Sequence, residues 1–318
     1  MNARRISAIV AVAALSAAAG CSNHQVIPLQ SAPGSGLAVP SNAVSRAGWL
    51  SPQGKAGKGL LYVADQPNQR VAIFTQTGTP AGQITDAIAG PDGLYADPNG
   101  TLYVANFGAG TVTEYPKGQT THSKTLTGSI GPKYVVAGHD GTVYLSDFAD
   151  GTNGKLYEYA GGSTTPTTTI SFSTFPAGIA LDRHGKLYVA YTDSGNNDIE
   201  VLKFAPGKTT GKNLGIHIKF DNAGGLAFDR NDNLLLDDQS LPGVDVFPPG
   251  ATSPSQQIKG FSLAYQIALN HGNTHLYVSN PFGPSVVEVA YPSGTPIRSI
   301  SNSLAGAYGV ATSPDSPY

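Results

Sequence analysis

The fold is decided by residues 91–106, which read Pro-Asp-Gly-Leu-Tyr-Ala-Asp-Pro-Asn-Gly-Thr-Leu-Tyr-Val-Ala-Asn. Apolar side chains alternate in two short runs, a pattern typical of β-strands. The Asn-Gly pair between the runs suits a tight hairpin turn, because such a turn needs residues with positive φ. The stretch therefore predicts two antiparallel strands joined by a short turn.

The same unit recurs along the chain, at residues 133–147, 176–190, 224–237 and 266–280. Its first strand is marked six times, by Leu94, Val135, Ile179, Leu226, Ile267 and Val310. Its second strand is also marked six times, by Tyr62, Tyr103, Tyr144, Tyr188, Leu235 and Tyr277. A repeat of about forty residues with four strand-like segments has the size of one propeller blade. The sequence therefore predicts an all-β fold, a six-bladed β-propeller of four-stranded blades.

Both ends of the repeat region are incomplete. Residues 60–65 match a second strand with no first strand before it, and residues 307–311 match a first strand with no second strand after it. Because ring closure removes exposed sheet edges, we expect the N- and C-terminal strands to pair in one blade. Trp49, the only tryptophan, is expected on the outer flank or the base of the propeller.

The N-terminus has the pattern of a secretory signal. Arg4 and Arg5 precede an apolar run at residues 6–19, and small residues lead directly to Cys21. This run is shorter than the ~20 residues that span a bilayer. Cys21 is the only cysteine, so the chain cannot form an intrachain disulfide.

This N-terminus resembles that of bacterial lipoproteins, although the family prefers Leu where this chain has Ala18. The resemblance implies a signal peptide at residues 1–20, a lipid such as palmitate on Cys21, and a location at the cell envelope. The membrane would be contacted through the lipid alone. Since Ser22 and not Asp follows the cysteine, it implies the outer membrane if the host has two membranes. An ordinary secretory signal is the alternative.

The remaining chain divides in two by composition. Residues 21–47 are rich in small and polar side chains and are expected to form a flexible tether. Residues 48–318 are expected to form the propeller. The formal net charge is −2, which provides no basic surface for nucleic acid, whose affinity comes largely from phosphate neutralisation. We expect a monomer without a nucleic-acid partner.

The repeats resemble the six-bladed propellers of NHL-repeat and SMP-30-like proteins. The shared motifs are Leu-Tyr-Val-Ala-Asp/Asn and Gly-Leu/Ile-Ala-x-Asp, and the resemblance covers roughly residues 48–318. It implies the fold more than an activity, because propellers include lyases, lactonases, sensors and binding modules. It also implies that the starts of the first strands and the loops after the second strands meet on one face, around a central channel.

Four strand-start residues on that face differ from blade to blade, so the repeat does not explain them. They are the candidate ligand-binding residues Asp92, Lys133, Tyr265 and Tyr308. Asp92 and Lys133 begin neighbouring strands, so an ion pair between them is expected to be geometrically possible. The loops add the aromatic candidates Phe107, Phe148, Tyr191 and Phe282. Aromatic rings beside hydrogen-bonding groups suit a small molecule, a glycan or a protein segment.

Other polar residues on that face have a structural explanation. Short polar side chains end the second strands at equivalent positions, where we expect them to cap turns: Asp65, Asn106, Asp147, Asp237 and Asn280. His139, His184 and His271 fall in the turns of the opposite face. His122, His217 and His275 lie singly, without the spacing of metal ligands.

The sequence does not predict a metal site, a cofactor or a catalytic residue. SMP-30-like enzymes hold a divalent cation with a glutamate, asparagines and an aspartate, and Asp92 matches that aspartate. No Glu or Asn occupies the other strand starts, whereas hard cations need several oxygen ligands. The favoured function is a non-catalytic binding module. The alternatives are a hydrolase or lyase that uses Asp92 and Lys133 with Tyr265 or Tyr308, and a structural scaffold of the envelope.

Overall fold

The computed structural model describes residues 47–148, 153–193, 195, 198–218, 223–239 and 242–313. The chain divides into two compact units, residues 1–39 and 40–318. The expected signal peptide, the lipid site Cys21 and residues 22–46 of the expected tether lie outside the described residues. In the described part, no helix is long and apolar enough to cross a membrane.

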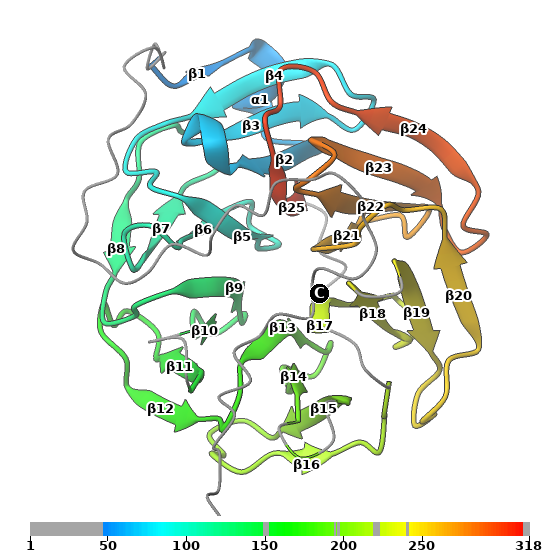
Figure 1. The fold of residues 1–318 in the computed structure, drawn as a ribbon. Helices are drawn as coiled ribbons and strands as arrows, with labels where there is room; N and C mark the ends of the chain where they lie inside the picture. The colour runs from blue at the N-terminus through cyan, green and yellow to red at the C-terminus, as the bar shows by residue number, and fades with distance from the viewer. Residues whose placement is uncertain are drawn as a thin grey trace, which may run out of the picture. The chain divides into compact units, whose positions relative to one another are not determined.

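The described residues between 47 and 313 build six antiparallel sheets arranged in a ring, the blades of a β-propeller (Figure 1). Their innermost strands line a central channel. In the second to sixth blades, the strands follow one another outward from the channel in chain order. The second and third blades contain β5 (Pro91–Ala96), β6 (Leu102–Asn106), β7 (Thr111–Tyr115), β8 (Lys124–Leu126), β9 (Pro132–Ala137), β10 (Val143–Asp147), β11 (Lys155–Tyr159) and β12 (Thr168–Ser171). The fourth and fifth contain β13 (Pro176–Leu181), β14 (Leu187–Thr192), β15 (Ile199–Phe204), β16 (Lys212–Asn213), β17 (Ala223–Phe228), β18 (Leu234–Asp238), β19 (Gly243–Phe247) and β20 (Gln256–Lys259). The sixth contains β21 (Ile267–Leu269), β22 (His275–Asn280), β23 (Ser285–Ala290) and β24 (Pro296–Ile300).

The first blade closes the ring with strands from both ends of the propeller. Its innermost strand, β25 (Ala307–Ser313), pairs with β2 (Leu60–Asp65), so that Val310 lies opposite Val63. The predicted closure is therefore confirmed. The outer strands are β3 (Arg70–Thr75), β4 (Pro80–Ile84) and the two-residue β1 (Trp49–Leu50).

Because of β1, the first blade has five strands instead of the predicted four. Trp49 lies on this outermost strand and is 45% exposed, in keeping with the expected outer flank. Two short helical segments complete the blade, α1 (Pro52–Ala56) and the 3-10 turn η1 (Gln66–Asn68). Ser51 is the N-cap of α1, and its Oγ accepts a hydrogen bond from the Gly54 amide at 3.1 Å.

The core consists of apolar layers between neighbouring blades. One layer joins Leu60 and Ile73 of the first blade to Leu94 and Leu102 of the second, all at most 2% exposed. Burying one such side chain contributes roughly 1.5–3 kcal/mol, so the layers hold adjacent sheets together. The repeating pattern of the sequence is thus the pattern of these layers.

The innermost strands come into backbone contact with one another near their starts. β5, β13 and β17 each carry a bulge there, between Pro91 and Leu94 in the case of β5. A Cβ atom on Gly93 would clash with the Lys133 carbonyl oxygen, and one on Gly309 with that of Asp92. Glycine at this position therefore lets adjacent blades approach closely.

Two blades depart from this glycine pattern. The third blade has Tyr134 and the sixth has Gln266 where the others have Gly93, Gly178, Gly225 and Gly309. Both side chains are buried, with exposed fractions of 4% for Tyr134 and 8% for Gln266. Since the packed backbones leave no space between the blades, these two side chains occupy the channel.

Candidate functional site

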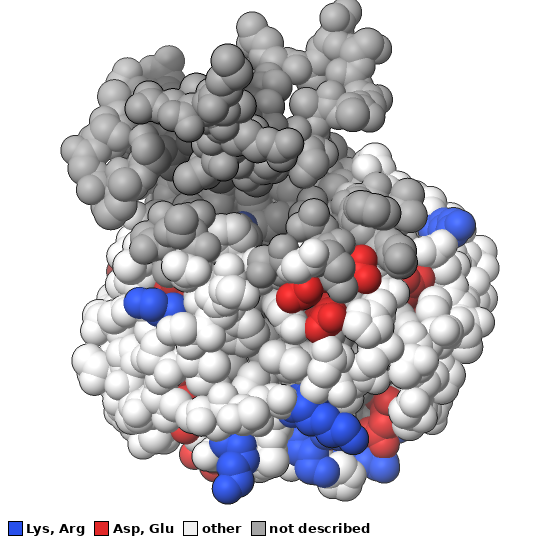
Figure 2. Space-filling view, turned by 60° about the horizontal axis from the view of Figure 1, so that its bottom comes forward, with Lys and Arg blue, Asp and Glu red and all other residues white. Residues whose placement is uncertain are grey.

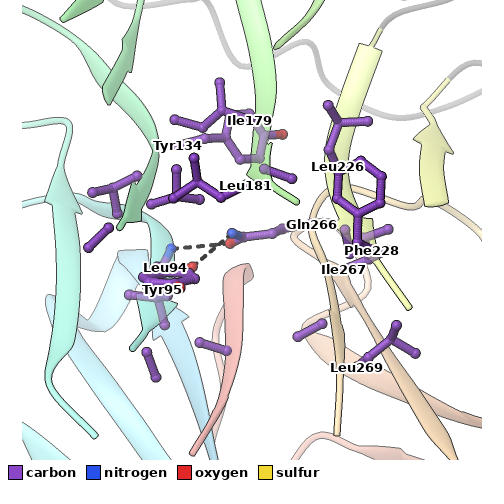
Figure 3. A pocket seen from close by; sticks show the side chains of 18 of the residues that line it. Leu94, Tyr95, Tyr134, Ile179, Leu181, Leu226, Phe228, Gln266, Ile267 and Leu269 are labelled. Atoms are coloured by element: carbon purple, nitrogen blue, oxygen red, sulfur yellow. Dashed lines mark hydrogen bonds between the residues drawn. The ribbon is translucent and has the colours of Figure 1, made fainter. Parts of the chain in front are cut away.

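Tyr134 and Gln266 divide the channel into two parts. Gln266 Oε1 accepts a hydrogen bond from the Leu94 amide at 3.2 Å, and its Nε2 donates to the Leu94 carbonyl at 2.9 Å (Figure 3). Its Oε1 also accepts from the Val310 amide at 3.0 Å. Tyr134 Oη donates to the Tyr265 carbonyl at 2.8 Å. These bonds link the sixth blade to the first, second and third blades across the ring and form a partition.

The side of this partition that carries the strand starts is called the mouth face below; the other side is the turn face.

Two of the predicted residues form a buried ion pair at the mouth face. Lys133 Nζ lies 2.9 Å from Asp92 Oδ2, and their side chains are 13% and 2% exposed. The expected ion pair is therefore present.

Tyr265 completes a closed hydrogen-bonded cluster with this pair. The Lys133 ammonium donates to Tyr265 Oη, which in turn donates to Asp92 Oδ1 at 3.1 Å. Burial raises the pKa of Asp92, whereas the charge of Lys133 and the hydrogen bonds oppose that rise. Burial and the nearby Asp92 carboxylate hold the pKa of Tyr265 well above its usual range, so the phenol remains a donor.

Aromatic rings surround the Lys133 ammonium. Its Nζ lies 4.9 Å from the ring centroid of Tyr265, 5.0 Å from that of Phe148 and 5.4 Å from that of Phe107. Such contacts stabilise a cation by roughly 0.5–2 kcal/mol each. The Tyr308 ring meets Tyr265 edge-on, with 5.6 Å between centroids. Six of the eight predicted residues are therefore close together at the mouth.

The other two predicted residues lie outside this cluster, although Phe282 belongs to a loop of the same face. Tyr191 Oη donates to Glu200 Oε2 at 2.6 Å and its ring packs on Phe172, which places it within the fourth blade. Phe282 lies in the loop after β22 and is 82% exposed. One aromatic residue was missed, Phe175, whose ring centroid is 4.7 Å from that of Phe148. Its position directly before Pro176 at a strand start was the available signal.

The predicted turn-capping role holds for four of the five residues and is wrong for Asp237. Asp147, for example, accepts hydrogen bonds from the amides of Ile130 at 2.8 Å and Gly131 at 3.1 Å. In the fifth blade, Asp238 pairs with Ala223 as Asn106 pairs with Pro91, and so ends the strand in the equivalent register. Asp237 instead stands where other blades have alanine or serine.

Asp237 lies at the mouth, in the space that a side chain at position 224 would occupy. A Cβ atom on Gly224 would overlap Asp237 Oδ1, so the carboxyl fills the space of a strand-start side chain. It is fully buried, and neither oxygen accepts a hydrogen bond of ordinary geometry in the described part of the chain, although the Gly225 amide lies near the carboxyl. Burial holds its pKa well above the usual range, although the Gly225 amide opposes this. Asp237 also raises the pKa of Tyr134 and Tyr265, in agreement with its placement beside them.

The mouth residues do not fit the divalent cation that the SMP-30-like resemblance implies. Asp92 is engaged by Lys133, and the groups around the pair are phenols and phenyl rings. Among the described residues, no three His, Cys, Asp or Glu side chains come together as a possible metal site. His122, His217 and His275 each face a single carboxylate, with His122 Nδ1 2.6 Å from Asp86 Oδ2.

The surface in Figure 2 is mostly uncharged where it is described. Several Lys and Arg lie toward its lower edge and others at its left and upper right, while Asp and Glu lie near its middle and among the basic residues (Figure 2). This view agrees with a charged fraction of only 13% of the residues.

Comparison with known proteins shows the fold. No protein-family model matches the sequence, and no curated protein matches it. A chain in the crystal structure of a nidogen/laminin complex is similar over 80% of this chain and 97% of its own length, with a TM-score of 0.64 and 15% identity. A Bacteroides caccae protein of unknown function is similar over 80% of this chain and 98% of its own length, with a TM-score of 0.62 and 12% identity. A chain of Kuenenia stuttgartiensis hydrazine synthase is similar over 81% of this chain and 87% of its own length, with a TM-score of 0.60 and 15% identity. The chain is thus a six-bladed β-propeller.

Proposed function

We propose that this propeller is a binding module whose mouth face holds a small molecule, a glycan or a segment of a partner protein. The observation that carries the proposal is the position of exposed apolar side chains. Five large ones are strongly exposed in the described residues, and three belong to loops of the mouth face: Phe107 at 39%, Ile130 at 46% and Phe282 at 82%. Exposed apolar groups gathered on one face are typical of interaction sites.

The loop of Phe282 is built to hold its ring outward. Asn280 Oδ1 accepts hydrogen bonds from the amides of Phe282 at 3.1 Å and Gly283 at 3.0 Å. This turn fixes the backbone on both sides of the ring, so little conformational entropy is lost when a ligand covers it. Phe107 is fixed likewise, because its amide donates to the Gly90 carbonyl at 2.9 Å.

The test compares serine substitutions at the mouth with one on the outer edge. The probes are a panel of neutral oligosaccharides and a peptide library. We expect Phe107→Ser and Phe282→Ser to weaken binding at least tenfold. Ile297→Ser, at a similarly exposed residue of β24, should leave it unchanged. Equal affinity in all three variants would reject the mouth face as the binding surface.

The proposed location is the cell envelope, with the propeller anchored through a lipid on Cys21. The support is the lone cysteine directly after a basic, apolar and then small-residue leader. Metabolic labelling with palmitate should mark the native chain and not Cys21→Ala. Labelling that persists in the variant would show that the anchor is elsewhere.

The second candidate is a hydrolase or lyase of the SMP-30 type. It is favoured by the contact between Asp92, Lys133 and Tyr265, and by Asp237 beside them, because perturbed acids in a cleft are frequent in active sites. Lactones and esters are the substrates to assay. Hydrolysis that is lost in Asp237→Asn and kept in Phe282→Ser would favour the enzyme over the binding module.

A further inference from the structure

On the turn side of Tyr134 and Gln266 the channel is a cavity of about 120 Å³ (Figure 3). Every blade contributes its innermost strand to the wall, and most lining side chains are aliphatic or aromatic. None of the mouth residues Asp92, Lys133, Tyr265 and Tyr308 lines it. The lining includes His139 and Gly185, which are exposed residues of the turns, so the cavity opens at the turn face.

The wall also offers backbone hydrogen-bonding groups. Each innermost strand ends its sheet, so no strand lies beside it on the channel side in the described structure. The Leu94 and Val310 groups that bond to Gln266 therefore face the channel. Ala96 and Thr312 lie two residues further along the same strands, and their amides and carbonyls point the same way. The Leu269 carbonyl also faces inward, since it accepts from Thr312 Oγ at 2.7 Å.

Gln266 shows what such a wall binds. Its neutral, planar amide accepts from two N–H groups of adjacent blades and donates to one carbonyl, while apolar side chains surround it. A charged group would lose its hydration here without an ionic partner, which costs far more than burying a paired amide. The wall thus favours neutral ligands that carry both a donor and an acceptor.

We propose that the turn-side cavity is a second ligand site, which binds a small, neutral, cyclic molecule with an amide-type donor and acceptor. Its apolar part contacts residues such as Ile179, Leu226 and Phe228, and its amide bonds to strand edges beyond those that Gln266 occupies. A closed apolar cavity of about 150 Å³ accommodates benzene, so this cavity of about 120 Å³, which is open at the turn face, has room for one small ring and no more. The partition separates this site from the mouth face.

The probes are three six-membered rings that differ in polar groups. 2-Piperidone has the amide donor and acceptor, cyclohexanone has the acceptor alone, and piperidine is a cation at neutral pH. Titration calorimetry on the full chain should give the lactam at least tenfold higher affinity than the ketone and no detectable binding of the cation. Equal affinity for lactam and ketone, or binding of the cation, would overturn the proposal.

A pair of variants tests the location. Leu181 is half-buried in the wall, so Leu181→Phe fills part of the cavity and should weaken 2-piperidone binding at least tenfold. Ile297→Phe likewise replaces an aliphatic side chain with phenylalanine, on the outer strand β24, and should have no effect. Melting temperatures of both variants check that the fold is kept. Lactam binding that survives Leu181→Phe and is lost in Phe282→Ser would place the site at the mouth and reject this one.

Discussion

At the scale of single residues, the buried pair of Lys133 and Asp92 stabilises the mouth. An exposed ion pair contributes up to about 1 kcal/mol, whereas removing one member of a buried pair costs roughly 3–5 kcal/mol because the other charge is left without a partner. The 13% and 2% exposure of the two side chains places this pair in the second class. Its importance for stability can therefore be measured directly.

We predict that Lys133→Met lowers the free energy of unfolding by about 3 kcal/mol, since among the described residues Asp92 then keeps only the neutral Tyr265 hydroxyl as side-chain donor. The double variant Lys133→Met with Asp92→Asn should recover much of that loss. Urea denaturation of the two single variants and the double variant gives the coupling energy. Additive losses would mean that the pair is not coupled in the folded state.

Asp237 should make stability depend on pH. Its pKa is raised in the folded protein, so its contribution is fully present below its unfolded pKa and is lost as the pH rises through the folded value. Asp237→Asn cannot ionise. We predict equal urea midpoints for the two proteins near pH 4 and a higher midpoint for the variant at pH 8.

Asp245 is the necessary control for this prediction. Burial raises its pKa to about 6, so Asp245 titrates between the two pH values that are compared. Both proteins are therefore compared again in an Asp245→Asn background. A gap between the midpoints that does not widen with pH would show that Asp237 does not titrate in the folded protein.

At the scale of the elements, the strands and their pairing could be predicted, but part of the site could not. Alternating apolar residues fix which face of a strand is buried, so the register follows from the pattern. At Asp237-Asp238 the pattern offers two acidic residues side by side, and only the pairing of Asp238 with Ala223 shows which one ends the strand. The pattern does show that Tyr134 and Gln266 replace glycine, but their bonds across the channel depend on its width.

We predict that Gly309→Ala destabilises the protein by about 1–3 kcal/mol or more, the usual cost of overpacking. The added methyl would clash with the Asp92 carbonyl oxygen and lie 2.9 Å from Gln266 Oε1. Gly272→Ala is the matched control, because its nearest contact is a threonine side chain at 3.3 Å. Equal melting temperatures for the two variants would contradict backbone contact between the blades.

At the scale of the whole molecule, the number of blades and the closure of the ring could be predicted because both strand markers occur six times and the incomplete repeats match. The ligand could not be predicted. Binding depends on side chains that differ between blades, such as Lys133 and Tyr265, and on loops such as that of Phe282, for which a repeat supplies no information. Their arrangement follows from the ring that brings them together.

Closure by β25 should decide whether the ring stays folded. Deleting residues 305–318 removes the inner partner strand of β2 and the Val310 amide that Gln266 binds. It also removes the amides of Ala305 and Gly306, which donate to Asp65 at 3.0 and 3.2 Å. The edge of β2 is then free to pair with other chains. We predict aggregation, faster proteolysis and a lower melting temperature.

A proline pair separates closure from general damage to a strand. Val310→Pro removes an amide of the closing strand, whereas Ile297→Pro changes the outermost strand β24, where proline is better tolerated. We expect the first variant to behave like the deletion and the second to remain soluble with a small loss of melting temperature. Equal losses of melting temperature would mean that β25 contributes no more to the stability of the ring than an outer strand does. The apolar layers between the blades would then hold the ring.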